Sequence, residues 1–393
     1  MKLRSCLAVL LSALSTTIAQ AQINPAMQGI AGNEVLLGSI IDLSGPVAAY
    51  GKDVRNGLQM GISDFNARGG AHGRKLRLVV EDNAYDPKRS VLAAQKLVNQ
   101  DKVFGVVGTF GTPNALAAMQ VQLPRNVFSL FPMALSRDMY EPLHKLKFAM
   151  LPASLDQIRG VVPGLYRERK ASNACTLYQD DDYGHEVVQG AEAGLKSIGV
   201  TLNERTSYKR GATDFSSQVA RLKASGCDFV VLGTVIRETV GAINEARKIS
   251  YSPTFVAAST AYSELVPKLG GPAMDGLYAV NTAGHPYLDD ASEEVAAWAG
   301  RYQQQFQSAP TVFAVYGFTM IELIGKALAK AGPELDTDRF SKALETMGEV
   351  PGDIFGNPPM RFSASQHLGS DRSRLSQLQN GRWKVVLDYK QLK

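Results

Sequence analysis

Apolar and polar residues follow one another in short blocks along the chain, in the pattern of β-strands followed by helices. Residues 35–41 form an apolar run without a polar face, which is typical of a strand covered on both sides. Apolar side chains then recur at Val54, Leu58, Ile62 and Phe65, a spacing that predicts an amphipathic helix. Further strands are predicted at 76–80, 103–107 and 127–131, and helices at 87–99 and 113–122. This repetition predicts an α/β fold with a parallel sheet.

The same pattern starts again after residues 151–154, a short segment that we interpret as a hinge. The second series has strands at 174–178, 201–206, 228–232 and 254–257, with helices at 184–197, 215–224 and 238–248. Long helices are predicted at 292–305 and 311–331, and a hairpin at Asn380-Gly381 is predicted to join strands at 374–379 and 383–389. The sequence therefore predicts two doubly wound, Rossmann-like α/β lobes.

The N-terminal residues predict a cleaved secretory signal over residues 1–21. Lys2 and Arg4 precede the apolar stretch 6–14, which is well short of the ~20 residues that cross a bilayer. Ala19-Gln20-Ala21 fits the small-x-small cleavage rule, so the mature chain is expected to begin near Gln22. The alternatives are an uncleaved anchor and an N-terminus that is simply frayed. We expect an exported protein of the periplasm.

Length and charge exclude some classes of function. A chain of 393 residues is too long for one ordinary core, in agreement with two domains. The formal net charge of +5 falls to +3 when Lys2 and Arg4 are removed. So small a net charge, without a cluster of basic residues, argues against nucleic acid and against an anionic membrane surface as partners.

Two cysteines, Cys175 and Cys227, remain after the signal segment. Each stands at the start of a predicted strand, and these would be the first and third strands of one lobe, which lie side by side in a doubly wound sheet. In an oxidising compartment an even number of cysteines suggests a disulfide. The alternative is two buried thiols, because free cysteine is a common small core residue.

Ligands of open parallel sheets bind outside the carboxyl ends of the strands, so the loops that leave those ends are the candidate site. These loops are 42–51, 108–114 and 179–184, each polar and each followed by a helix. In the second loop Thr112 is predicted to be the N-cap and Pro113 the first helical residue. The free N–H groups of such a helix end suit a carboxylate.

The order and spacing of these loops resemble one protein family over nearly all of the chain after the signal. The residues that carry the resemblance are 43–51, 108–114, 178–184 and 214–223. The family is the leucine-binding-protein type of periplasmic binding protein, which has the type I fold. The resemblance implies two lobes joined by a three-segment hinge, residues 34–151 with about 280–357 and residues 152–279 with about 358–393. It also implies a monomer that captures a small molecule and hands it to an inner-membrane ABC permease.

The resemblance implies a set of contacts in the cleft. Thr112 would hold a ligand carboxylate, while Tyr50 and Tyr183 would flank the ligand, with Phe110, Gly111 and Ser136 near them. One departure from the family lies in the segment 133–136, which contains Ala134 and Ser136. Many relatives carry a threonine in this segment, and that threonine also holds the carboxylate.

A second departure from the family concerns the charge of the ligand. Amino-acid binders place an acidic residue in the loop after the last strand of the second lobe, and Ser259 aligns with that position. A buried ammonium without a partner is costly. We therefore expect a carboxylate that lacks the α-ammonium, such as an aromatic or aliphatic acid. An ordinary amino acid stays open, because Glu264 is near enough to serve if the alignment is shifted.

Enzymatic function is the first alternative, and the sequence does not support it. His185-Glu186 begins a zinc-protease motif, but Gln189 stands where the second histidine would be. Nucleophile-elbow and phosphate-loop motifs are missing, and Asp180-Asp181-Asp182 lacks the spacing of a calcium loop. No catalytic residue, metal or cofactor is predicted. The second alternative is a sensory receptor subunit of the same fold, which the sequence does not separate from transport.

Overall fold

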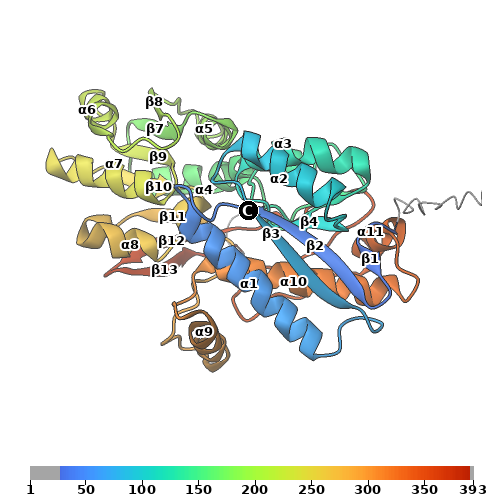
Figure 1. Cartoon of the computed structure of the whole chain (residues 1–393). Coiled ribbons are helices and arrows are strands. Elements are labelled where there is room, and N and C mark those ends of the chain that lie inside the picture. Colours follow the sequence, from blue (N-terminus) through green and yellow to red (C-terminus); the bar gives the residue numbers. More distant parts are fainter. Residues whose placement is uncertain (1–26, 390–393) are drawn as a thin grey trace, which may run out of the picture.

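The computed structural model describes residues 27–389 and contains two sheets, each covered by helices (Figure 1). We call the first sheet with its helices the first lobe and the second sheet with its helices the second lobe. In the first sheet, strands β3, β2, β4, β5 and β6 lie side by side in that order and are parallel, and β1 pairs antiparallel with β2. The bounds are β1 Ile30–Ala31, β2 Glu34–Ile41, β3 Lys75–Asp82, β4 Gly105–Val107, β5 Phe128–Leu130 and β6 Lys147–Phe148.

The second sheet has the order β13-β12-β11-β10-β9-β7-β8. Strands β7 to β11 pair in parallel, and β12 and β13 form the antiparallel hairpin at Asn380-Gly381. The bounds are β7 Ala174–Gln179, β8 Glu204–Tyr208, β9 Phe229–Gly233, β10 Thr254–Ala257, β11 Tyr278–Asn281, β12 Arg374–Gln379 and β13 Arg382–Leu387. Strand β8 begins three residues later than the sequence pattern predicted.

Helices of the first lobe come from both ends of the chain. They are α1 Ala48–Ala67, α2 Pro87–Asn99, α3 Thr112–Gln122, α9 Glu293–Phe306, α10 Val312–Ala331 and α11 Thr337–Thr346. Those of the second lobe are α4 Ser154–Glu168, α5 Asp182–Lys196, α6 Ser216–Ala224, α7 Ile236–Lys248 and α8 Leu265–Gly270. Helix α10 is long and apolar enough to cross a membrane by composition, but 78% of that stretch is buried inside the protein. It is therefore the core helix of the first lobe.

Glycines allow α1 and α10 to approach closely. A Cβ atom on Gly57 would lie 2.0 Å from the carbonyl oxygen of Ala314, and one on Gly317 would lie 2.4 Å from that of Val54. Any larger residue would therefore push the two helices apart. This contact joins a segment near residue 57 to one near residue 317, so the chain returns to the first lobe after building most of the second.

The late part of the chain crosses between the lobes again. Phe362 packs on Phe131 and Phe148 of the first lobe, and Leu368 bridges to Ala149. The sequence analysis assigned residues from about 358 to the second lobe, whereas the structure places this stretch against the first sheet. Strand β12, which begins at Arg374, belongs to the second sheet.

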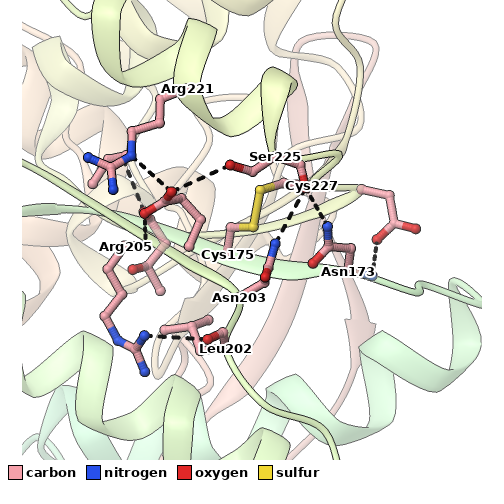
Figure 2. The surroundings of a disulfide bond; sticks show 12 residues. Asn173, Cys175, Leu202, Asn203, Arg205, Arg221, Ser225 and Cys227 are labelled. Atoms are coloured by element: carbon pink, nitrogen blue, oxygen red, sulfur yellow. Dashed lines mark hydrogen bonds and ion pairs between the residues drawn. A yellow bond between two sulfur atoms is a disulfide. The ribbon is translucent and has the colours of Figure 1, made fainter.

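Cys175 and Cys227 form a disulfide in the second lobe, with their Cα atoms 5.9 Å apart (Figure 2). Cys175 lies in β7, and Cys227 lies two residues before the start of β9, the strand that pairs with β7. Both residues are buried. The expected signal segment, residues 1–21, lies outside the described part of the chain.

Candidate functional site

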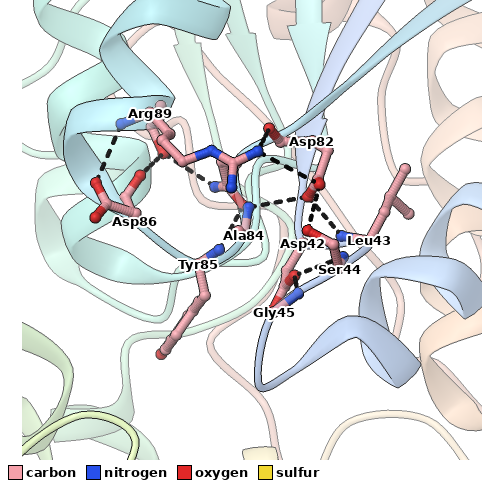
Figure 3. A network of polar contacts seen from close by, with 11 residues as sticks. Asp42, Leu43, Ser44, Gly45, Asp82, Ala84, Tyr85, Asp86 and Arg89 are labelled. Carbon is pink, nitrogen blue, oxygen red and sulfur yellow. Dashed lines mark hydrogen bonds and ion pairs between the residues drawn. The ribbon is translucent and has the colours of Figure 1, made fainter.

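Two buried or half-buried carboxylates shape the loops at the carboxyl end of the first sheet (Figure 3). Asp42, after β2, accepts hydrogen bonds from the backbone N–H groups of Ser44, Gly45 and Val47 at 3.1, 2.5 and 2.8 Å. Asp82, at the end of β3, accepts from the Ser44 hydroxyl and from the N–H groups of Leu43 and Ala84. Although desolvation raises the pKa of Asp82, these hydrogen bonds outweigh it and hold the pKa below its ordinary value.

The same arrangement of a tyrosine and a glycine recurs in both lobes. A Cβ atom on Gly51 would lie 1.8 Å from the carbonyl oxygen of Asp42, and one on Gly184 would lie 1.8 Å from that of Gln179. Each helix can therefore start against the end of its strand only because glycine stands there. The residue before each glycine, Tyr50 or Tyr183, is thereby fixed at the junction of the two lobes.

Tyr50 joins the two lobes directly. Its ring stacks on Phe110 with centroids 5.5 Å apart and lies 4.1 Å from the ring of Phe313. Its hydroxyl donates to the carbonyl oxygen of Thr260, in the second lobe. Tyr50 is fully buried, and burial raises the pKa of its hydroxyl far above the ordinary range.

Tyr85 forms a second link between the lobes. Ala84 and Tyr85 both have positive φ angles, 45° and 60°, which turn the chain sharply after β3. The Tyr85 carbonyl accepts from Arg210 Nη1 at 2.6 Å, and the Arg210 guanidinium lies 4.5 Å from the centre of the Tyr85 ring. Arg210 also donates to Asp181 Oδ2 at 2.8 Å, while Gln179 Nε2 donates to the Tyr85 hydroxyl at 3.4 Å. Burial raises the pKa of Tyr85 to about 12.

The start of α3 differs from the expectation. Gly111, with φ 92°, is the N-cap, and Thr112 is the first helical residue, so the prediction that Thr112 caps the helix is wrong. The left-handed conformation at Gly111 brings its N–H to the Met133 carbonyl at 3.0 Å and moves the helix start one residue earlier. Thr112 Oγ1 is consequently buried without a hydrogen-bond partner in the described structure.

Tyr183 is held by the loops that follow β9 and β10. Its hydroxyl donates to the carbonyl oxygen of Thr234 at 3.1 Å and lies 2.5 Å from Thr260 Oγ1, which also bonds to Thr234. Burial raises the pKa of the Tyr183 hydroxyl well above its ordinary value, so the group is neutral and acts as a hydrogen-bond donor.

A narrow cavity lies between the lobes, and we call it the interlobe cavity. Its walls come from both lobes and are mainly apolar and aromatic. They consist of Tyr85, Phe110, Gly111, Thr112, Met133, Leu135, Leu151, Tyr183, Val235, Ser259, Thr260, Phe313 and Tyr316. None of these lining residues carries a charged side chain.

Five of the predicted site residues line the interlobe cavity, and three do not. Phe110, Gly111, Thr112, Tyr183 and Ser259 are on its walls.

The other three lie behind or beside the walls. Tyr50 bridges the lobes behind Phe110, and Ala134 is buried in an apolar cluster with Met139. Ser136 accepts from the Asp138 N–H and donates to Glu186 Oε1 at 3.0 Å.

Sequence reasoning missed several residues of the walls. Phe313 and Tyr316 come from α10, whose apolar run gave no sign that one end faces a cavity. Tyr85 follows β3, where a polar loop with an aromatic residue was a usable signal. Glu264, the alternative ammonium partner, is not on the walls and lies 3.8 Å from His285 instead.

A larger hollow lies elsewhere, between α1, α9, α10 and residues 350–360. Its walls belong to the first lobe alone, so a ligand there would not touch both lobes. Among residues 27–389 no group of three or more acidic, histidine or cysteine side chains is arranged to hold a metal ion.

Comparisons with known proteins agree with this geometry. Residues 34–382 match the model of a family described as periplasmic binding protein. The Leu/Ile/Val-binding protein homolog 7 of Brucella abortus (strain 2308) is 28% identical over 398 residues, which cover 96% of both chains.

Two solved structures share the fold. A possible leucine/isoleucine/valine-binding protein from Rhodopirellula baltica SH 1 has a TM-score of 0.82 at 18% identity, covering 94% of this chain and 100% of the other. A fatty acid ABC transporter substrate-binding protein from Thermomonospora curvata has a TM-score of 0.82 at 21% identity, covering 93% and 96%. These likenesses confirm the predicted fold class of two α/β lobes.

Proposed function

The chain belongs to the periplasmic binding protein family, and from this premise we propose that it captures a small carboxylate between its two lobes and delivers it to an ABC importer. Its relatives include Leu/Ile/Val-binding proteins, and its structural neighbours include substrate-binding proteins of ABC transporters. Such proteins bind their ligands without chemical conversion.

The observation that carries the proposal is the interlobe cavity with the unpaired hydroxyl of Thr112 on its wall. Buried hydroxyl groups nearly always have a hydrogen-bond partner. Thr112 opens helix α3, where the first N–H groups lack helical acceptors and the helix dipole favours an anion. A ligand carboxylate at this place would accept from both the hydroxyl and the N–H groups.

Closure of the lobes is the mechanical part of the proposal. A ligand in the interlobe cavity touches both lobes, so it stabilises the closed form and shifts the population toward it. Two direct hydrogen bonds between the lobes also stabilise the closed form, one from Tyr50 to Thr260 and one from Arg210 to Tyr85. We propose that the chain crosses between the lobes near residue 151, near residue 280 and between residues 368 and 374.

The ligand belongs to one of two classes. Aromatic or aliphatic acids fit walls made of aromatic and apolar side chains, with Ser259 where an acidic residue would pair an ammonium. Branched-chain and other amino acids are the second class. We also propose that the protein acts as a monomer in the periplasm, with an inner-membrane permease as its partner.

A thermal-shift screen tests the proposal. The protein would be unfolded and refolded to remove carried-over ligand, and then melted with aromatic and aliphatic acids beside branched-chain and aromatic amino acids. Ligand at a hundred times its Kd adds about 2.7 kcal/mol of stability, which raises Tm by several degrees. No shift with any member of either class would contradict the proposal.

A pair of threonine variants locates the site. Thr112→Val is expected to weaken the binding of the ligand found in the screen about tenfold, because one hydrogen bond to a charged group is lost. The matched control is Thr109→Val, since Thr109 is equally buried in the same loop but does not line the cavity. Equal affinities for both variants would place the carboxylate elsewhere.

A further inference from the structure

The second lobe contains a buried acid next to the interlobe cavity. Glu238 lies in the first turn of α7, three residues after Val235, which lines the cavity. Only 2% of its surface is exposed. Its carboxylate accepts a hydrogen bond from its own backbone N–H, and Oε2 has no partner within the described structure. The sequence analysis did not single out this residue.

Other polar atoms without partners gather at the same edge of the sheet. Tyr208 Oη and Gln179 Oε1 are also buried without a hydrogen-bond partner. Tyr208 and Gln179 are the last residues of β8 and β7 and lie opposite each other in the ladder. Strand β9, which leads to Glu238, pairs with β7 on its other side. Three neighbouring strand ends thus present unsatisfied polar groups, where a native protein normally has almost none.

Within residues 27–389 no cation forms an ion pair with Glu238, although the charge of Arg237 partly lowers the pKa of its carboxyl group. Arg237 is adjacent in sequence but its side chain is exposed to solvent, and Arg210 is engaged by Asp181 and by the Tyr85 carbonyl. The groups on other elements that interact with the charge of Glu238 are tyrosine hydroxyls. The tyrosines whose titration its charge influences are Tyr50, Tyr85, Tyr183 and Tyr208. Burial raises the pKa of Glu238, because an ionised carboxylate without a counter-ion is costly there.

We propose that Glu238 binds a cationic group of the ligand, an ammonium, at the second-lobe end of the interlobe cavity. In molecules whose Glu238 is protonated before binding, the carboxyl group loses its proton to the buffer when the carboxylate pairs with the ammonium. The inference rests on the proposed function and narrows it to amino acids, with the countercharge supplied by the loop after β9 and not by Ser259.

A structural role is the competing explanation, since an acidic residue in the first turn also stabilises its helix. Glu238→Gln separates the two roles. The amide oxygen of glutamine can still accept from the backbone N–H, but the side chain cannot ionise. Glu186→Gln is the matched control, because Glu186 is a half-buried acid of this lobe with a raised pKa and an unpartnered Oε2, and its Oε1 accepts from Ser136, which lies outside the cavity walls.

The experiment uses two pairs of probes, L-leucine with 4-methylpentanoate and L-phenylalanine with 3-phenylpropanoate, whose members differ only in the ammonium group. Titration calorimetry in two buffers of different ionisation enthalpy gives both the affinity and the number of protons released. We expect one amino acid to bind about 30-fold or more tightly than its acid, as for a buried charge pair. We also expect up to one proton to be released in mildly acidic buffer, and affinity to rise with pH as Glu238 becomes ionised. Glu238→Gln should abolish the preference and the proton release, whereas Glu186→Gln should keep both.

The outcomes separate this inference from the proposed function. If only the acids bind, or if Glu238→Gln keeps the preference and the proton release, the inference is wrong and capture of a carboxylate stands. If no probe binds, the proposed function fails and the inference fails with it. Should Glu238→Gln not fold, the preference and proton release of the unaltered protein still decide the question.

Discussion

Reduction of the Cys175–Cys227 disulfide is expected to destabilise the second lobe by acting on its unfolded state. The bond joins residues 52 apart in sequence. The loop-closure relation for a ring of this size gives an entropy of about 14 cal/mol/K, or about 4 kcal/mol at 25 °C. The folded state should change little, because β7 and β9 pair directly and the side chain of Asp228 accepts hydrogen bonds from the N–H groups of Ser172 and Asn173.

The assay follows urea unfolding of the same protein with and without a reductant. The chain has two tryptophans, Trp298 in the first lobe and Trp383 in β13 of the second. Trp298→Phe leaves Trp383 as the fluorescent reporter of the lobe that contains the disulfide, and Trp383→Phe leaves the reporter of the other lobe. Trp298 Nε1 has no hydrogen-bond partner in the described structure, so its replacement removes none.

The expected result is a loss of about 4 kcal/mol in the unfolding free energy reported by Trp383. A thiol titration of the denatured, unreduced protein should find no free thiol from this pair. Two free thiols would show that the bond does not form. A reduced protein within about 1 kcal/mol of the oxidised one would refute the reasoning from the unfolded state.

Three further predictions concern the lobes and the cavity. Tyr183→Phe keeps the ring but removes its hydroxyl bonds, so ligand affinity should fall several-fold in titration calorimetry; an unchanged Kd would exclude a role for the hydroxyl. Arg210→Ala removes the interlobe hydrogen bond to Tyr85 and should weaken ligand binding about 10- to 100-fold. At equal ligand concentration the variant should have a larger radius of gyration in small-angle scattering, and equal radii would contradict a role of this hydrogen bond in closure. Burial raises the pKa of Asp53 to about 6, so between about pH 4 and pH 6 the folded state holds a proton that the unfolded state has lost. The free energy of unfolding should therefore fall as pH rises through this range. Asp53→Asn should flatten that part of the Tm profile, and an unchanged profile would show that another group causes it.

Local pattern in the sequence determined the architecture of this protein. Apolar runs and helical spacing report which faces of an element are buried, and this is a property of neighbouring residues. The β-α repetition therefore predicted both parallel sheets, and the Asn380-Gly381 turn predicted the hairpin. The two tyrosine-glycine loops were recognisable for the same reason, because Gly51 contacts the carbonyl of Asp42 and Gly184 contacts that of Gln179, nine and five residues earlier in the chain.

Tertiary structure alone decided the composition of the cavity. Phe313 reaches it because glycines let α10 lie close against α1, and no local pattern encodes which helices meet. The hydroxyl of Thr112 is left unpaired by the left-handed Gly111, a one-residue shift that capping preferences did not reveal. Glu238 is a similar case, since a glutamate in the first turn of a helix is ordinary until packing buries it near tyrosines and, within residues 27–389, leaves its Oε2 without a partner. Burial and hydrogen-bond satisfaction depend on all the neighbours in space, and the sequence names only the neighbours along the chain.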